Sequence, residues 1–125
     1  LMKGESPTIN GDGNYSRDFT YIENVIQANL LSLVTNNEKA INTIYNVAYG
    51  DRNTLNDLMD YLKEYLSEFD SKIIGLKVIY GPNRAGDIPH SHASVDKAKE
   101  LLNYNPQFSL QKGLKEAVKW YWKSL

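Results

Sequence analysis

The sequence predicts an α/β fold, because short apolar runs typical of strands alternate along the chain with longer amphipathic patterns typical of helices. Its 125 residues suit one domain, and no repeat, low-complexity tract or linker divides them. A hydrophobic content of 42% with 23% charged residues lies well outside the range of disordered chains. We therefore expect about four helices joined by short strands and loops.

The first elements are expected to form a hairpin. Residues 7–10 resemble a short strand, residues 11–14 (Gly-Asp-Gly-Asn) form a turn cluster, and residues 17–22 are rich in aromatic and β-branched side chains. Two such runs around a glycine-containing loop are typical of a β-hairpin.

A helix is predicted to follow from Ile22 to Val34. Apolar residues recur there at three- and four-residue steps, which is the spacing of one helix face. Ala28 and Leu31 add apolar surface on the other side. We therefore expect this helix to be covered by protein on two sides.

The middle of the chain predicts two strands flanking a helix. Residues 44–48 and 77–80 are short apolar runs, and both are expected to be strands. Thr54 and Asp57 have the spacing of a capping box, which predicts a helix start there.

Two further helices are predicted near the C-terminus, each with a serine at its start. Ser94 can cap a helix that stops at Asn103, before a proline. Ser109 can cap the last helix, whose inner face carries Leu110, Leu114, Ala117, Val118 and Tyr121.

The composition excludes several function classes. With 14 Lys and Arg against 15 Asp and Glu, the net charge of −1 argues against nucleic acid or an acidic membrane surface as a partner. The apolar runs are far shorter than the roughly 20 residues that span a bilayer. No cysteine is present, so disulfides and thiolate chemistry are excluded. We expect a soluble cytoplasmic protein.

Two of the three arginines stand in glycine-bearing loops next to an aspartate: Arg17 before Asp18, and Arg84 before Asp87. A guanidinium offers a planar fork of donors that matches phosphate oxygens, and a nearby carboxylate can accept from ribose hydroxyls. The alternative is that each arginine pairs with its neighbouring aspartate on the surface. The third, Arg52, is interpreted as a solvated loop residue, with an anion contact as its alternative.

Metal sites receive little support. The segment from Asp12 to Glu23 imitates a calcium loop, but Arg17 stands where the sharp turn needs glycine. His90 and His92, with one nearby carboxylate, lack a further ligand for zinc. We predict no metal.

Catalytic and dinucleotide motifs are also missing. No nucleophile–base arrangement is visible, no tyrosine has a lysine four residues later, and no Gly-x-Gly-x-x-Gly turn follows a strand. We therefore predict no catalytic and no cofactor-binding residue in these 125 residues.

Taken in order, however, the motifs resemble the C-terminal, substrate-binding part of the extended short-chain dehydrogenase/reductases that act on nucleotide sugars. Among these they most resemble bacterial UDP-N-acetylglucosamine 4-epimerases of the NAD-dependent epimerase/dehydratase family. The resemblance covers nearly the whole chain, and the segments that carry it are 8–13, 16–19, 22–25, 45–48, 84–87, 96–98, 104–106, 113–114 and 120–121.

The resemblance implies a role for each matched site residue. Arg17 and Arg84 would hold the UDP diphosphate, and Asp87 would accept from the uridine ribose. Ser91 would face the 2-substituent of the sugar, where a small residue leaves room for an N-acetyl group. Thr8 and Asn10 would lie against the uracil, mostly through backbone groups.

The resemblance also implies the reaction of the parent enzyme, which is a reversible oxidation at the sugar C4. A tyrosine would act as the base and tightly bound NAD would accept the hydride. The hydride would then return to the opposite face of the 4-keto sugar. The expected substrates are UDP-GlcNAc and UDP-GalNAc, or UDP-Glc and UDP-Gal, used in polysaccharide biosynthesis by a homodimer. The alternatives are a dehydratase or decarboxylase of the same superfamily, or a non-catalytic UDP-sugar-binding module.

The resemblance finally predicts how the chain is organised. Residues 1–125 would be the UDP-sugar-binding portion, and the N-terminal Rossmann half that carries NAD and the catalytic tyrosine and lysine would be absent. Residues 22–48 would pack on that missing Rossmann sheet. The chain alone is therefore expected to be inactive and to expose an apolar patch.

Overall fold

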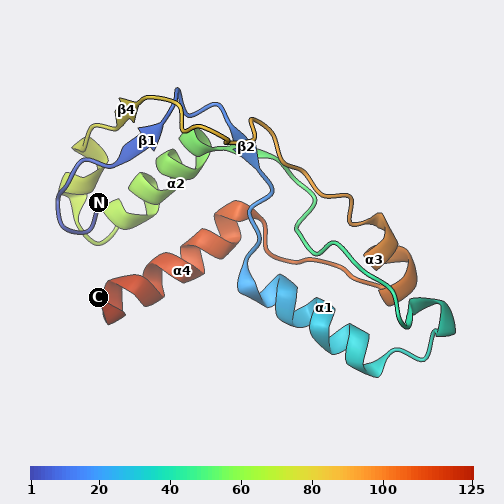
Figure 1. Ribbon diagram of the computed structural model, residues 1–125. Helices are drawn as coiled ribbons and strands as arrows, with labels where there is room; N and C mark the ends of the chain where they lie inside the picture. The colour runs from blue at the N-terminus through green and yellow to red at the C-terminus, as the bar shows by residue number, and fades with distance from the viewer.

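The computed structural model describes residues 1–125 and shows an α/β arrangement drawn out between two ends (Figure 1). Helices α2 and α4 lie with strands β1 and β4 at the end that holds both termini, and helices α1 and α3 lie at the other. In chain order the elements are β1 Thr8–Asn10, β2 Ser16–Arg17, α1 Ile22–Val34, the 3₁₀ helix η1 Glu38–Ala40, β3 Asn53–Thr54, α2 Leu55–Ser67, the 3₁₀ helix η2 Ser71–Gly75, β4 Ile79–Gly81, α3 Asp96–Leu102 and α4 Leu110–Ser124.

All four predicted helices form, and their ends follow from local hydrogen bonds. The Thr54 hydroxyl accepts from the Asp57 N–H (3.0 Å) and the Asp57 carboxylate accepts from the Thr54 N–H (2.7 Å), which completes the predicted capping box. The hydrogen bonds from Thr54 hold the pKa of Asp57 below its ordinary value. Ser109 caps α4 by accepting from the Lys112 N–H, and α3 ends at Asn103 in the left-handed conformation.

The prediction that Ser94 caps α3 was wrong. The N-cap position belongs to Val95, which has no side-chain capping bond. The Ser94 hydroxyl lies one residue further out, where it donates to the Asp96 carboxylate (2.9 Å) and accepts a long hydrogen bond from the Asp96 N–H (3.4 Å). The serine therefore contacts the first residue of α3 without occupying the N-cap position.

The predicted hairpin does not form. Strand β1 pairs in parallel with the distant strand β4, with Ile9 opposite Tyr80, and β2 pairs antiparallel with β3. The turn between β1 and β2 runs through Gly11 and Gly13, both with positive φ, so it redirects the chain instead of folding β2 back onto β1.

The strand expected over residues 44–48 is also absent, since this segment makes no strand ladder. A strand needs a hydrogen-bonding neighbour, and no other strand of the chain lies beside it. Ile44 is 88% exposed there. The other strand prediction, over residues 77–80, is displaced by two residues at its start, since β4 covers Ile79–Gly81.

Two separate hydrophobic clusters stabilise the two ends of the molecule. The first joins α1 and α3 around Ala28, Ala98 and Tyr104, and the second joins α2, η2 and α4 around Leu66 and Ile73. Only 17 of 125 residues are buried, so many large apolar side chains remain at the surface. None of the helices combines the length and hydropathy that crossing a bilayer requires.

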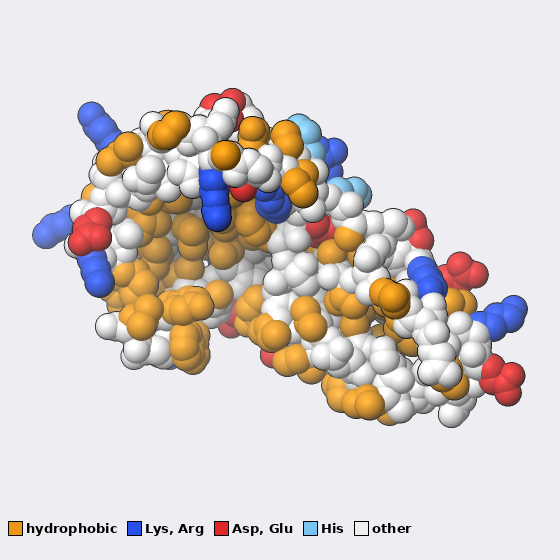
Figure 2. Space-filling view, viewed as in Figure 1, with side chains coloured by type: hydrophobic (Ala, Val, Ile, Leu, Met, Phe, Trp, Pro, Cys, Tyr) orange, Lys and Arg blue, Asp and Glu red, His pale blue; other side chains and the backbone are white.

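Helix α1 is covered on one side only, contrary to the expectation from its sequence. Its Ala28 side packs in the first cluster, whereas the opposite side carries large apolar residues that are between 42% and 80% exposed. Figure 2 shows hydrophobic side chains along the lower edge of the molecule over this helix. We call this surface the α1 apolar face; it consists of Ile22, Ile26, Leu30 and Leu33.

Candidate functional site

An open polar cleft of about 440 Å³ lies where the parallel strands β1 and β4 end. Ligands of α/β proteins bind outside the carboxyl ends of parallel strands, because the loops that leave these ends gather there. The cleft is lined by Gly11, Asp12, Tyr15, Tyr80, Gly81, Pro82 and Asn83.

A glycine keeps the two loops at this edge in close contact. Gly11 has a φ of +80°, and a Cβ atom at this position would lie 2.2 Å from the Asn83 Oδ1. A side chain here would therefore push the Asn83 loop away, in addition to straining the backbone. Arg84 follows directly in that loop.

Thr8 and Asn10, both predicted to contact a ligand, lie at the edge of this cleft. They are exposed on β1, on either side of the buried Ile9. A Cβ atom built on Gly81 would lie 3.6 Å from the Thr8 Cγ2 and 3.9 Å from the Asn10 Oδ1, so both side chains border a cleft residue.

Arg17 lies on β2, beside the loop that carries the other predicted residues. A parallel bridge joins Ser16 to His90, with hydrogen bonds from Ser16 N–H to Pro89 O (2.9 Å) and from Ser91 N–H to Ser16 O (3.0 Å). The Arg17 Nη1 donates to the carbonyls of Ser16 and Pro89. The fold thus brings Arg17 and Ser91 to one seam.

Arg84 and Asp87 occupy a turn in the same loop. The Asp87 N–H donates to the Arg84 carbonyl (3.3 Å), and Gly86 supplies the positive φ that the turn requires. The side chain of Arg84 is exposed. All six predicted residues therefore lie on β1, β2 and the loop from residue 84 to 91.

Neither of these arginines pairs with its neighbouring aspartate, which was the alternative interpretation of the sequence. The Asp18 carboxylate accepts from the Gly50 N–H (3.1 Å) instead, and the only ion pair in the chain joins Lys119 to Glu116. The positive charges of Arg17 and Arg84 are thus not neutralised by a protein carboxylate within salt-bridge distance.

Asp12 supplies the negative charge in the cleft. Hydrogen bonds from the backbone and side-chain amides of Asn14 lower the pKa of its carboxyl, so it remains ionised. This charge repels an anion, so a phosphate group is disfavoured beside Asp12, and neither Arg17 nor Arg84 is among the residues that line the cleft itself.

The sequence did not reveal how Ser16, Arg52 and His90 come together. Ser16 is only 5% exposed, and its hydroxyl lies 2.9 Å from His90 Nδ1 and 3.2 Å from Arg52 Nη2. Arg52 is exposed, as the interpretation of it as a solvated loop residue predicts, and its guanidinium in addition donates to the Ser16 hydroxyl. Only the pairing of β2 with two distant segments creates this contact.

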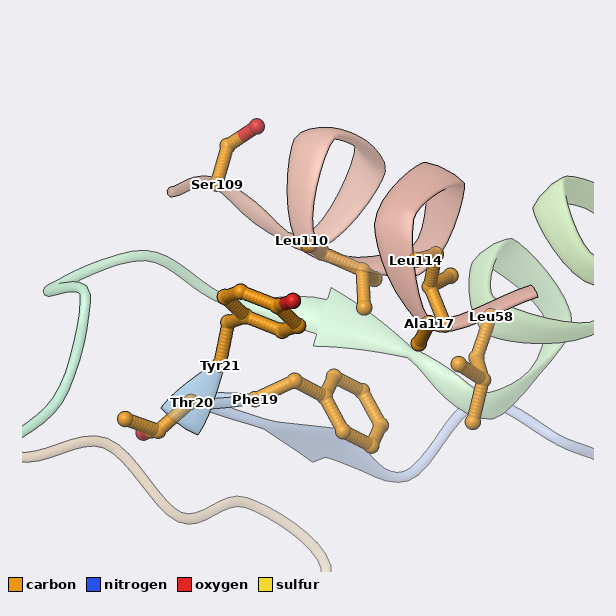
Figure 3. A pocket seen from close by; sticks show the side chains of 9 residues that line it. Phe19, Thr20, Tyr21, Leu58, Ser109, Leu110, Leu114 and Ala117 are labelled. Atoms are coloured by element: carbon orange, nitrogen blue, oxygen red, sulfur yellow. The ribbon is translucent and has the colours of Figure 1, made fainter. Parts of the chain in front are cut away.

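A second pocket, of about 190 Å³, is apolar and does not suit a charged ligand (Figure 3). The rings of Phe19 and Tyr21 lie against α4, and Leu58 of α2 closes one side. Gly113 makes the packing possible, since a Cβ atom there would lie 2.7 Å from Tyr21. Its lining contains no charged group.

The groups gathered on these segments are hydrogen-bond donors and carboxylates that face solvent. Two unpaired guanidinium groups, a nearby carboxylate and a polar cleft suit a phosphorylated ligand with hydroxyl groups.

Comparison with known proteins finds a matching family model and similar relatives. Residues 1–48 match the NAD dependent epimerase/dehydratase family. The chain is 34% identical over 122 residues to a putative UDP-glucose 4-epimerase of Methanocaldococcus jannaschii, covering 96% of this chain and 35% of that protein. It is 27% identical over 122 residues to a UDP-N-acetyl-alpha-D-glucosaminuronate decarboxylase of Bacillus cytotoxicus.

Solved structures of nucleotide-sugar epimerases are also similar to this chain. The UDP-glucose 4-epimerase of Thermotoga maritima, solved with UDP-glucose, is 36% identical with a TM-score of 0.84; the match covers 98% of this chain and 37% of that one. The UDP-N-acetylglucosamine 4-epimerase of Methanobrevibacter ruminantium, in complex with UDP-N-acetylmuramic acid, is 34% identical with a TM-score of 0.83, covering 99% and 37%. Over nearly its whole length the chain is thus similar to nucleotide-sugar epimerases of the extended short-chain dehydrogenase/reductase type, and it spans about a third of the length of these relatives.

Proposed function

We propose that this chain is the substrate-binding portion of an NAD-dependent nucleotide-sugar 4-epimerase that interconverts UDP-GlcNAc and UDP-GalNAc. The observation that carries the proposal is the absence of any carboxylate partner for Arg17 and Arg84, which lie on segments of one site. Arg84 is exposed, and Arg17 is half-buried with its Nη1 on two backbone carbonyls, so the remaining N–H groups of both guanidiniums are available to phosphate oxygens.

In this proposal each residue has one task. Arg17 and Arg84 bind the diphosphate, and Asp87 accepts from the ribose hydroxyls. Thr8 and Asn10 lie against the uracil at the end of β1. The sugar then extends along the seam toward Ser91, whose small side chain leaves space for an N-acetyl group.

The chain's own residues do not fit NAD. They contain no glycine-rich turn between a strand and a helix that could hold a pyrophosphate. We therefore derive no step of the reaction from these residues and propose that NAD and the tyrosine–lysine pair belong to the remainder of a longer parent protein. That parent is proposed to act as a homodimer in the cytoplasm, in polysaccharide biosynthesis, and the 125-residue chain alone to lack turnover.

A decarboxylase remains the second candidate because one of the relatives bears that name. Both reactions need the same UDP-sugar site. The residues that decide between them act on the sugar C4 and beyond, outside the groups described above. Decarboxylation requires a C6 carboxylate that leaves as CO2, so the parent is incubated separately with UDP-GlcNAc and with the corresponding uronate, and the products are separated by chromatography. An epimer of UDP-GlcNAc supports the epimerase, whereas a sugar shortened by one carbon, formed from the uronate, supports the decarboxylase.

Calorimetric titration of the chain with UDP tests the binding site. Arg84→Ala and Arg17→Ala are each expected to weaken binding by about 10- to 100-fold, because a hydrogen bond to a charged group contributes about 1.5–3 kcal/mol. Lys119→Ala is the matched control, since it removes an exposed cation at a distant helix and should leave the affinity unchanged. Equal affinity of wild type and Arg84→Ala would refute the phosphate assignment.

The sugar preference has its own test. Ser91→Tyr is expected to weaken the binding of UDP-GlcNAc while the affinity for UDP stays the same, because the larger ring fills the space of the N-acetyl group. If both ligands weaken together, Ser91 does not face the 2-substituent.

A further inference from the structure

The hydroxyl of Ser16 joins three segments that are far apart in the sequence. It lies 2.9 Å from His90 Nδ1 in the loop from residue 84 to 91, and 3.2 Å from Nη2 and 3.4 Å from Nε of Arg52, just before β3. Ser16 is buried, whereas Arg52 and His90 are exposed. Figure 2 shows the His side chains beside a basic side chain at this part of the surface.

The chemistry of the three groups fixes where the protons lie. A guanidinium can only donate, so the Ser16 oxygen accepts from Arg52. His90 Nδ1 is the one acceptor within hydrogen-bond distance of the buried Ser16 hydroxyl, so we infer that the hydroxyl hydrogen is donated to it. A neutral imidazole that accepts at Nδ1 carries its proton on Nε2, so the geometry selects one tautomer of His90.

The hydrogen bonds of the Ser16 hydroxyl lie on the face of β2 opposite to the Arg17 side chain. Side chains of successive strand residues point to opposite faces, so Ser16, with Arg52 and His90, lies on the face opposite to Arg17. The backbone of Ser16 meanwhile bonds to Pro89 and Ser91. The hydroxyl therefore fixes the loop against β2 without occupying the side from which Arg17 binds a ligand.

We propose that Ser16, Arg52 and His90 form a hydroxyl-centred clamp and are positioning residues for the UDP-sugar site. The clamp acts through Arg17 and Ser91 by fixing their separation, and it does not touch the ligand. This inference rests on the proposed function, since only a ligand held by both segments gains from the fixed separation.

The first test needs no ligand. Long-range ¹H–¹⁵N correlation spectra of the chain report which ring nitrogen of each histidine carries the proton, and His92 serves as the internal reference. We expect His90 of the wild type to be the Nε2–H tautomer, and Ser16→Ala to convert it into a mixture like that of a free imidazole. A mixture already present in the wild type would overturn the clamp.

The second test measures UDP affinity by calorimetry. Ser16→Ala and Arg52→Ala are each expected to weaken binding about tenfold, and Ser16→Thr, which keeps the hydroxyl, to stay within about threefold of wild type. The double variant should be no weaker than either single variant, because both remove the same clamp. Additive losses would mean that Arg52 contacts the phosphates directly, and would overturn the positioning role.

The two tests separate this inference from the proposed function. If wild type binds UDP but Ser16→Ala binds equally well, the positioning role is wrong while the proposed function stands. If wild type does not bind UDP, the proposed function is overturned and the positioning role falls with it. In that case the tautomer of His90 still decides whether the clamp exists.

Discussion

The buried side chain of Asn24 is expected to be the strongest single polar contact holding α1 in place. It is 1% exposed; its Oδ1 accepts from the N–H groups of Gln107 (3.0 Å) and Phe108 (3.1 Å), and its Nδ2 donates to the Phe108 carbonyl (2.8 Å). Asn24→Ala leaves three backbone groups without these partners. At about 1–3 kcal/mol for each unsatisfied buried group, with partial rescue by water, we expect a loss of about 3 kcal/mol.

Gln27 on the same helix is the matched control. Its side chain also makes a donor and an acceptor contact, both with the backbone of Asn105 (2.9 and 2.8 Å), but in an exposed position where water replaces them. Gln27→Ala should therefore cost only about 0.5–1 kcal/mol. Urea unfolding followed by circular dichroism measures both values, and an Asn24→Ala loss no larger than that of Gln27→Ala would refute the reasoning.

Three further perturbations follow. Gly11→Ala should destabilise the chain more than Gly86→Ala, since both have φ near +80° but only Gly11 faces the Asn83 side chain; equal urea midpoints would contradict this. Burial, with a smaller contribution from a nearby carboxylate, raises the pKa of the Tyr104 phenol, so its contribution to stability is complete below about pH 10 and is lost as the pH rises toward the raised value. Tyr104→Phe should remove that alkaline loss in pH-dependent unfolding, and an unchanged loss would refute the assignment. Leu33→Gln on the α1 apolar face should change the free energy of unfolding by less than about 0.5 kcal/mol and lower the binding of a hydrophobic dye; a larger loss would mean that the face is packed.

The helices could be predicted from the sequence because their causes are local. The capping box of Thr54 and the cap by Ser109 each involve residues three apart, and the apolar spacing of α1 is a property of one segment. The exception is Ser94, because α3 begins one residue later than a cap at Ser94 predicts and has Val95 at its N-cap.

The strands could not be predicted in the same way, since a strand depends on a partner elsewhere in the chain. The short strand predicted over residues 7–10 forms as β1, but its partner is β4 and not the nearby β2. Residues 44–48 have the composition of a strand and remain unpaired. Composition identifies the capacity to form a strand, and pairing decides whether one forms.

In the candidate site, the residue types could be used to select candidate residues from the sequence, but the contacts between distant residues could not be predicted. The sequence left Arg17 and Arg84 with two interpretations, and the structure shows that neither pairs with its neighbouring aspartate, while the phosphate ligand stays a prediction. Nothing local distinguishes Ser16 from other surface serines, or Asn24 from the polar side of an amphipathic helix. Their importance comes from burial between distant segments, which only the fold reveals.

The α1 apolar face and the binding site are linked through a short stretch of chain. Arg17 ends β2 and Ile22 begins α1, so at most about 17 Å of extended chain separates them. Two hydrogen bonds restrict the movement of this stretch further. The Asp18 carboxylate accepts from the Gly50 N–H, and the Asn24 side chain accepts from the backbone of the segment before α4. Any protein surface that covers the α1 apolar face therefore also restrains Arg17. In the proposed parent the covering surface is the Rossmann sheet, so the same link would fix the diphosphate relative to the domain that carries the reaction.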